Sequence, residues 1–238
     1  VCPLGNGATL TVLASLGDII GGASVPATNQ NDLSVAVLIQ YGGFDYLWAS
    51  DLGGGNVDTS CTGRSTTQVD VETSVVRAIS PGGAWPLISS GGVDVINVNH
   101  HGSESSTNMN WMNYSRPAVA IIPTGAGQAS NWFLPRIDVV DKVLRATATA
   151  CVTVPPAFVV QTEEGSPTGS LTSFTGYSVG NIKVTTNGAG TFTLSPDGGV
   201  NQGPKEVAAA GLPRTFALDN AGGSDTTAPT TSITSPAT

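Results

Sequence analysis

Residues 33–55 have the sequence LSVAVLIQYGGFDYLWASDLGGG, and this stretch predicts a β-hairpin. Two runs rich in β-branched and aromatic residues, 34–40 and 44–49, are joined through a Gly-Gly pair that supplies the backbone freedom of a tight turn. The second run leads to Asp51, and the glycines that follow allow the chain to turn sharply. A carboxylate is therefore expected at the end of a strand.

Strands and helices alternate through the rest of the chain. Apolar residues recur at helical spacing in residues 68–79 and again in residues 135–147, where a proline stands at the expected first helical position. Residues 105–117 predict a short helix capped by Ser or Thr. Residues 93–98 and 118–123 have the pattern of short strands. This order, with hairpins late in the chain, predicts an α/β fold.

Composition limits the classes of function. The chain has 238 residues, 39% of them apolar, which is enough for a real core. Its net charge of −8 argues against an extended basic groove for nucleic acid, which enters only as a candidate substrate whose phosphate is held by metal ions. The sequence contains no apolar run of about 18 residues, so it does not predict a membrane span. Few lysines and a tail rich in Thr and Pro predict a secreted protein, extracellular or periplasmic.

Three cysteines, Cys2, Cys61 and Cys151, lie far apart and form no CxxC motif, so a zinc–thiolate site is not expected. They are compatible with one disulfide and an odd thiol, or with a partner outside this chain. If Cys61 is oxidised, we expect its partner to be Cys2 or a residue outside the chain rather than Cys151.

The only two histidines, His100 and His101, stand together in VDVINVNHHGS, residues 93–103. They follow a predicted strand, as Asp51 does, and open sheets place functional groups at strand ends. Each feature also has a structural explanation, because Asp is common in Gly-rich turns and a histidine pair can be a solvent-exposed surface feature.

Taken together, these segments resemble the metallo-β-lactamase-fold hydrolases. LIQYGGFDYLWASDL, then VINVNHHGSESS, then RPAVAIIPTGAG and a helix are similar to the branch that includes the hydrolase domain of the DNA-uptake protein ComEC. The resemblance implies an αββα sandwich, of which residues 1–200 form the C-terminal half, with a mixed sheet and flanking helices. Residues 201–238 are expected to be an extended tail and linker toward an immunoglobulin-like repeat, because SDTTAPTTSITSPAT resembles the opening of such repeats.

The resemblance also implies a metal-dependent hydrolase of phosphodiester bonds that uses zinc or manganese. Asp51 matches the carboxylate that bridges two metal ions, and His100 matches a ligand or an orienting residue. His101 and Ser103 match the groups that contact the substrate's phosphate or protonate its leaving group. Such chemistry is physically consistent, because metal ions lower the pKa of a shared water and an imidazole transfers protons near neutral pH.

Two departures from the family pattern concern the metal ligands. The family's HxHxDH motif is absent, so its ligands are expected from an N-terminal half of the same polypeptide. Trp132 stands where the family has a further histidine, and an indole offers no lone pair to a metal. One metal site is therefore expected to be lost. We predict that this chain alone binds at most one transition-metal ion, weakly, and has no phosphodiesterase activity without its N-terminal partner segment.

Three interpretations follow: a part of an enzyme completed by another segment, a degenerate non-catalytic binding or structural module, or an unrelated secreted domain with a histidine pair on its surface. The position of Asp51 relative to His101 discriminates among them. For the hydrolase, their side chains should lie roughly 4 to 8 Å apart at one rim of the sheet.

Overall fold

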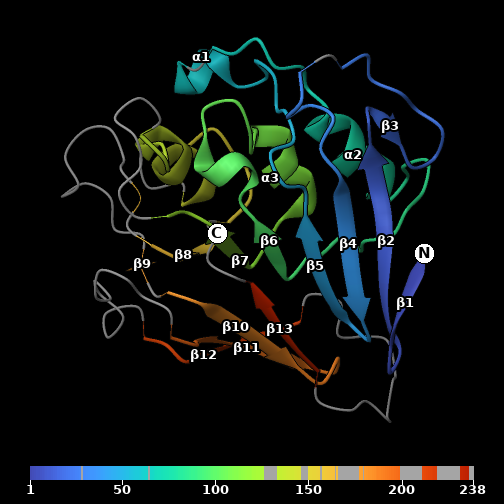
Figure 1. Ribbon diagram of the computed structural model, residues 1–238, viewed down its shortest axis with the longest axis vertical. Coiled ribbons are helices and arrows are strands. Elements are labelled where there is room, and N and C mark those ends of the chain that lie inside the picture. Colours follow the sequence, from blue (N-terminus) through green and yellow to red (C-terminus); the bar gives the residue numbers. More distant parts are fainter. Residues whose placement is uncertain are drawn as a thin grey trace.

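The computed structural model describes residues 1–27, 29–63, 65–125, 133–145, 150–155, 157–163, 165, 177–178, 180–198, 211–218 and 231–235. Within them, a large mixed sheet carries helices on one face and a smaller antiparallel sheet on the other (Figure 1). The predicted α/β class with a mixed sheet and flanking helices is confirmed.

The large sheet contains, in the described residues, the strands β1 (Cys2–Gly5), β2 (Ala8–Ser15), β3 (Asp18–Ile19), β4 (Ala36–Tyr41), β5 (Phe44–Trp48), β6 (Val95–Asn97), β7 (Val119–Ile122), β8 (Phe158–Gln161) and β9 (Tyr177–Ser178). The small sheet is built from β10 (Ile182–Thr186), β11 (Thr191–Pro196), β12 (Arg214–Ala217) and β13 (Thr231–Ser235). The helical segments among the described residues are α1 (Thr59–Thr62), α2 (Glu72–Ile79), the short 3₁₀ segment η1 (Asn99–Gly102), α3 (Met109–Ser115) and the π-helical η2 (Val139–Leu144).

The large sheet changes from antiparallel to parallel at β5. Its order is β1-β2-β4-β5-β6-β7-β8-β9, with β3 paired to β2. The predicted hairpin is present as β4 and β5, while β5, β6, β7 and β8 pair in parallel. Parallel strands end at the same edge of a sheet, so the segments that follow β5, β6 and β7 meet there.

Side chains of the central strands alternate between two apolar cores. Leu47 of β5 faces the helices, where it joins the core formed with Val76 of α2 and Trp111 of α3. Phe44 and Tyr46, on the opposite face of β5, pack in the core shared with the small sheet. This period of two explains why a strand with few polar residues is stable here, since both of its faces are covered.

Each of the three predicted helices begins about four residues later than the sequence pattern suggests, and the one predicted at 135–147 corresponds to η2, which begins at Val139. The segment predicted at 68–79 is helical from Glu72, because the backbone N–H groups of Val71 and Glu72 donate to the carbonyl of Gly53 instead. The predicted Ser or Thr cap of α3 is wrong, since Asn108 accepts the hydrogen bond from the backbone N–H of Trp111 at 2.9 Å. In the described segments, no helix combines the length and the apolar character needed to cross a membrane.

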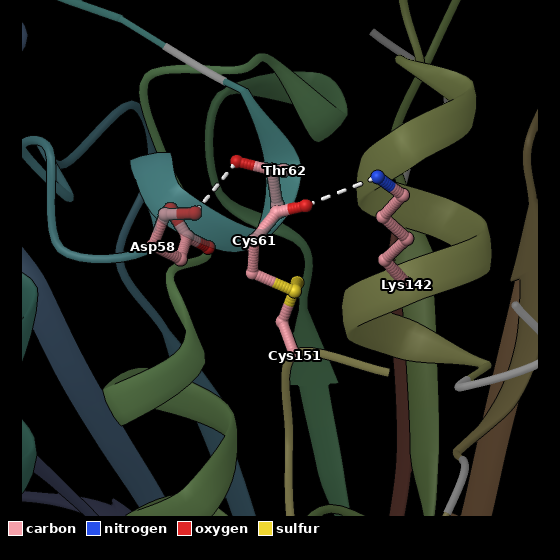
Figure 2. The surroundings of a disulfide bond; sticks show 5 residues. All are labelled: Asp58, Cys61, Thr62, Lys142 and Cys151. Atoms are coloured by element: carbon pink, nitrogen blue, oxygen red, sulfur yellow. Dashed lines mark hydrogen bonds between the residues drawn. A yellow bond between two sulfur atoms is a disulfide. The ribbon is translucent and has the colours of Figure 1, made fainter. Parts of the chain in front are cut away.

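The cysteine pairing expected from the sequence is also wrong. Cys61 forms a disulfide with Cys151, and Cys2 is an exposed free thiol. Figure 2 shows the disulfide beside α1, where the ammonium of Lys142 donates to the carbonyl of Cys61 at 3.1 Å. The two cysteines are 90 residues apart in sequence, so only the packing of η2 and the following segment near α1 brings them together.

Two strands of the small sheet come from the stretch expected to be an extended tail. The hairpin β10–β11 has the predicted turn at Asn187 and Gly188, and β12 and β13 pair with its two outer sides. The described part of residues 201–238 therefore contributes strands to this sheet.

Gly42 is expected to be essential where the turns of the two sheets meet. It has φ +56°, and a Cβ atom there would lie 2.3 Å from the carbonyl oxygen of Gly188, which already accepts from Gly43 N–H at 2.7 Å. Gly42→Ala should lower the free energy of unfolding by about 2 kcal/mol. The control is Gly82→Ala, where φ is +81° but no atom lies within 4 Å, so it carries only the backbone strain. Urea denaturation that gives equal losses for both variants would contradict the packing argument.

Candidate functional site

Asp51 and the histidine pair meet at the carboxyl edge of the parallel strands. Asp51 follows β5, His100 and His101 follow β6, and Pro123 follows β7. The Nε2 atom of His101 lies 3.7 Å from Oδ1 of Asp51, and each side chain is 36% exposed. The expected proximity of these two residues at one rim of the sheet is confirmed, at a distance slightly below the expected range.

A backbone carbonyl orients the imidazole of His101. Its Nδ1 lies 2.6 Å from the carbonyl oxygen of Pro123, and because a carbonyl only accepts, Nδ1 carries the proton and donates it. In the neutral ring, the lone pair is then on Nε2, which faces the Asp51 carboxylate. Two acceptor atoms at this separation repel each other unless a proton, a water or a cation lies between them. The pair is thus arranged to share one of these.

The backbone of the histidine pair is strained. His100 and His101 have φ values of 50° and 55°, in the left-handed region that residues with a Cβ atom avoid. Each such residue costs roughly 1–2 kcal/mol, and consecutive ones persist only where the surroundings hold them. One such restraint is the hydrogen bond from His100 N–H to the carbonyl of Ser50, at 2.9 Å, which ties the histidines to the segment that carries Asp51.

His100 and Ser103 belong to a separate set of contacts. The Nδ1 atom of His100 lies 3.1 Å from the hydroxyl of Ser105, which lies 3.0 Å from the hydroxyl of Ser103. Ser103 is buried, and its hydroxyl contacts Ser105 rather than the Asp51–His101 pair. Burial of the ring lowers the pKa of His100, although the Asp51 carboxylate acts in the opposite direction.

A polar pocket of about 540 Å³ opens beside His100. Hydroxyl and carboxamide side chains from distant segments line it, among them Asn31, Thr67 and Gln68. Glu104 and Arg136 also line it and form an ion pair, with Nη2 of Arg136 2.8 Å from Oε1 of Glu104. Burial works to raise the pKa of Glu104, but the hydrogen bonds and charge of Arg136 outweigh it and hold the pKa below its usual value.

Glu72 is a buried acidic residue that the sequence analysis did not single out. It lies under the histidine loop, residues 99–108, and is fully buried. Its carboxylate accepts from the side-chain amide of Asn99 at 2.6 Å and from the backbone N–H groups of Thr107 and Asn108 at 2.6 and 2.8 Å. Burial raises its pKa to about 7, against these hydrogen bonds. A signal was present, because Glu72 falls on the apolar stripe of its helix with Val75, Val76 and Ile79.

The described residues do not complete a metal site. They contain no cluster of three His, Cys, Asp or Glu side chains spaced to hold an ion, whereas a catalytic zinc ion usually has three protein ligands. Asp51 and His101 present two ligand atoms, with the His101 ring oriented through Nδ1 as metal-bound imidazoles commonly are. Trp132, on which the loss of one site was predicted, lies outside the described residues.

Neither the protein families nor the curated proteins provide a relative of this chain. No protein-family model matches the chain, and a search of curated proteins finds no match.

Proposed function

We propose that the protein is a hydrolase of phosphodiester bonds that works with a metal ion, zinc or manganese, and is completed by ligands from a further polypeptide segment. The approach of His101 Nε2 to Asp51 Oδ1, at the carboxyl edge of parallel strands, carries this proposal. Such edges are where α/β sheets hold substrates. A bound ion would lower the pKa of a water that attacks the phosphorus.

His101 is suited to hold or transfer a proton at Nε2. Its Nδ1–H donates to the Pro123 carbonyl, so the ring cannot turn without losing that hydrogen bond. Asp51 lies beside Nε2, and an imidazole that carries a proton on Nε2 can donate it to a leaving oxygen. His100 lies beside this pair and lines the polar pocket. The centroid of its ring is 6.2 Å from that of the His101 ring. Ser103 supports His100 through Ser105 in this arrangement.

The architecture is compatible with a hydrolase of the metallo-β-lactamase type. A helical layer, a mixed sheet and a second sheet are stacked in that order, an α/β arrangement that could form part of an αββα sandwich. The acidic turn after β5 and the histidines after β6 also follow the order of that family. The polar pocket next to His100 provides hydrogen-bonding groups for the part of a substrate beyond its phosphate.

The disulfide supports a secreted location. Disulfides persist in extracellular and periplasmic compartments and are rare in reducing ones. We therefore propose that the protein acts outside the cytoplasm. Its proposed neighbours are a further segment of the same polypeptide, which supplies metal ligands, and an immunoglobulin-like domain.

A non-catalytic secreted module is the alternative. The small number of metal ligands favours it. The chain has two histidines, and its described residues provide two ligand atoms, from Asp51 and His101, where a catalytic zinc site usually has three. In that case the polar pocket would bind a partner without chemical turnover.

Metal binding by the isolated chain separates the two functions. In equilibrium dialysis against zinc or manganese, we expect at most one weakly held ion, with affinity reduced at least tenfold by Asp51→Asn or His101→Gln. Asp18→Asn, an exposed carboxylate on β3, is the matched control and should bind as the unaltered chain does. Binding that is equally weak in all variants would favour the non-catalytic module. Two tightly held ions, or turnover of a chromogenic phosphodiester by this chain alone, would show that its ligands had been counted wrongly.

A further inference from the structure

We propose that Glu72 is a positioning residue, whose carboxylate fixes the histidine loop and thereby sets the distance between His101 and Asp51. This role rests on the proposed function, because that function makes His101 and Asp51 the residues that bind the metal ion and transfer the proton. The contacts between Glu72 and the loop do not depend on that function.

Glu72 binds both ends of the histidine loop. Asn99, which directly precedes the histidines, donates through its side chain, and Thr107 and Asn108 donate through their backbone at the other end. The loop thus closes around one carboxylate. His100 and His101 adopt left-handed backbone conformations between these fixed points, and such conformations require the surrounding structure to hold them.

Glu72 also contacts the segment that carries Asp51. A Cβ atom at Gly54 would lie 2.5 Å from Oε2 of Glu72, so the backbone packs directly on the carboxylate. Gly54 is joined to the histidine loop by its own N–H, which donates to the carbonyl of Ser105 at 2.8 Å, and by its carbonyl, which accepts from the side chain of Asn108 at 2.9 Å. The two segments that face each other at the site are therefore assembled on Glu72.

The anchor itself is rigid. Glu72 is the first residue of α2, and Val75 and Val76 in the next turn are fully buried in the core against the large sheet. Asp70 extends the same network, because its Oδ1 accepts from the side chain of Asn108 at 2.9 Å. A shift of the carboxylate would require the helix to move in its core, and close-packed cores resist such movement.

The test is Glu72→Gln in the metal-free chain, followed by the ring ¹⁵N signals of its only two histidines. The amide oxygen can still accept two hydrogen bonds, while the new NH₂ group opposes the N–H of Asn108. At about pH 8, where imidazoles are mostly neutral, the unaltered chain should show His101 protonated at Nδ1. We expect the variant to show a mixture of tautomers, because the ring loses its alignment with the Pro123 carbonyl.

Two further variants separate positioning from general stability. Gly54→Ala presses on the same carboxylate from the other side and should produce the same change in the His101 signals. Val76→Ala, buried on the same helix, is the control, and it should lower stability while leaving the His101 tautomer unchanged. The proposal is overturned if both Glu72→Gln and Gly54→Ala retain the original tautomer, or if Val76→Ala alters it to the same degree.

A zinc titration of the same variants distinguishes this proposal from the proposed function. We expect Glu72→Gln to weaken zinc binding about tenfold, as substitutions behind a metal ligand do. If Asp51→Asn binds zinc as tightly as the unaltered chain does, the hydrolase proposal fails. A change of the His101 tautomer in Glu72→Gln would still support the positioning role in that case. If Asp51→Asn weakens zinc binding but Glu72→Gln leaves the His101 tautomer unchanged, the positioning role of Glu72 fails and the hydrolase proposal stands.

Discussion

Replacing Cys61 and Cys151 together by alanine is expected to lower the free energy of unfolding by about 4 kcal/mol. The disulfide closes a loop of 90 residues, and in the chain-entropy description a loop of this length restricts the unfolded state strongly. Cys151 is buried and Cys61 packs against the same core, so alanine avoids placing a new polar group there. The measurement is urea denaturation of the double variant and the unaltered protein in the absence of reductant.

Cys2→Ala is the matched control, because this thiol is exposed and free. It should leave the unfolding midpoint unchanged. Thiol titration of the native protein should detect one reactive group, and titration after unfolding without reductant should detect the same one. A second thiol in the unfolded protein, or a double variant as stable as the control, would contradict the pairing.

The disulfide also bears on the polar pocket. Cys61 stands four residues before Ser65, the first of the pocket-lining residues Ser65, Thr66, Thr67 and Gln68. The bond joins this segment to the chain after η2, and the hydrogen bond from Lys142 to the Cys61 carbonyl reinforces the link. A covalent tie is suited to a wall made of short polar side chains, which bury little apolar surface of their own.

Local patterns in the sequence predict the elements that depend on neighbouring residues. The alternation and the Gly-Gly turn of residues 34–49 correspond to β4 and β5, and the helical spacing of residues 68–79 corresponds to α2. The approach of Asp51 to His101 was also predictable, because both follow strands and parallel strands end at one edge.

Features that depend on contacts between distant segments were not predictable in this way. The pairing of Cys61 with Cys151 requires the packing of η2. The left-handed backbone of His100 and His101 requires the hydrogen bonds that Ser50 and Glu72 make with the histidine loop. Glu72 lies between these cases. Its position on an apolar helix face indicates burial, but the donors that surround it come from residues 99–108, which the helical pattern does not reveal.

The free energy of unfolding is expected to decrease between about pH 4.5 and pH 7 through the ionisation of Glu72. Burial raises its pKa from 4.5 to about 7 in the folded protein. Below pH 4.5 the group is protonated in both states and contributes no difference. As the pH rises, the unfolded chain releases this proton first, so the folded state holds more protons and stability falls. Above pH 7 both states are ionised and the loss is complete, at about 3 kcal/mol.

Subtracting the Glu72→Gln variant isolates this effect. Burial also raises the pKa values of Asp32 and Asp70, which titrate in the same direction and remain in the variant, so their contributions largely cancel. The difference in unfolding free energy, unaltered protein minus variant, should become less favourable to the unaltered protein by about 3 kcal/mol from pH 4.5 to pH 7. A difference that does not change with pH would mean that the three N–H donors offset burial and leave the pKa of Glu72 equal in the folded and unfolded states. A difference that becomes more favourable to the unaltered protein as the pH rises would mean that the donors outweigh burial.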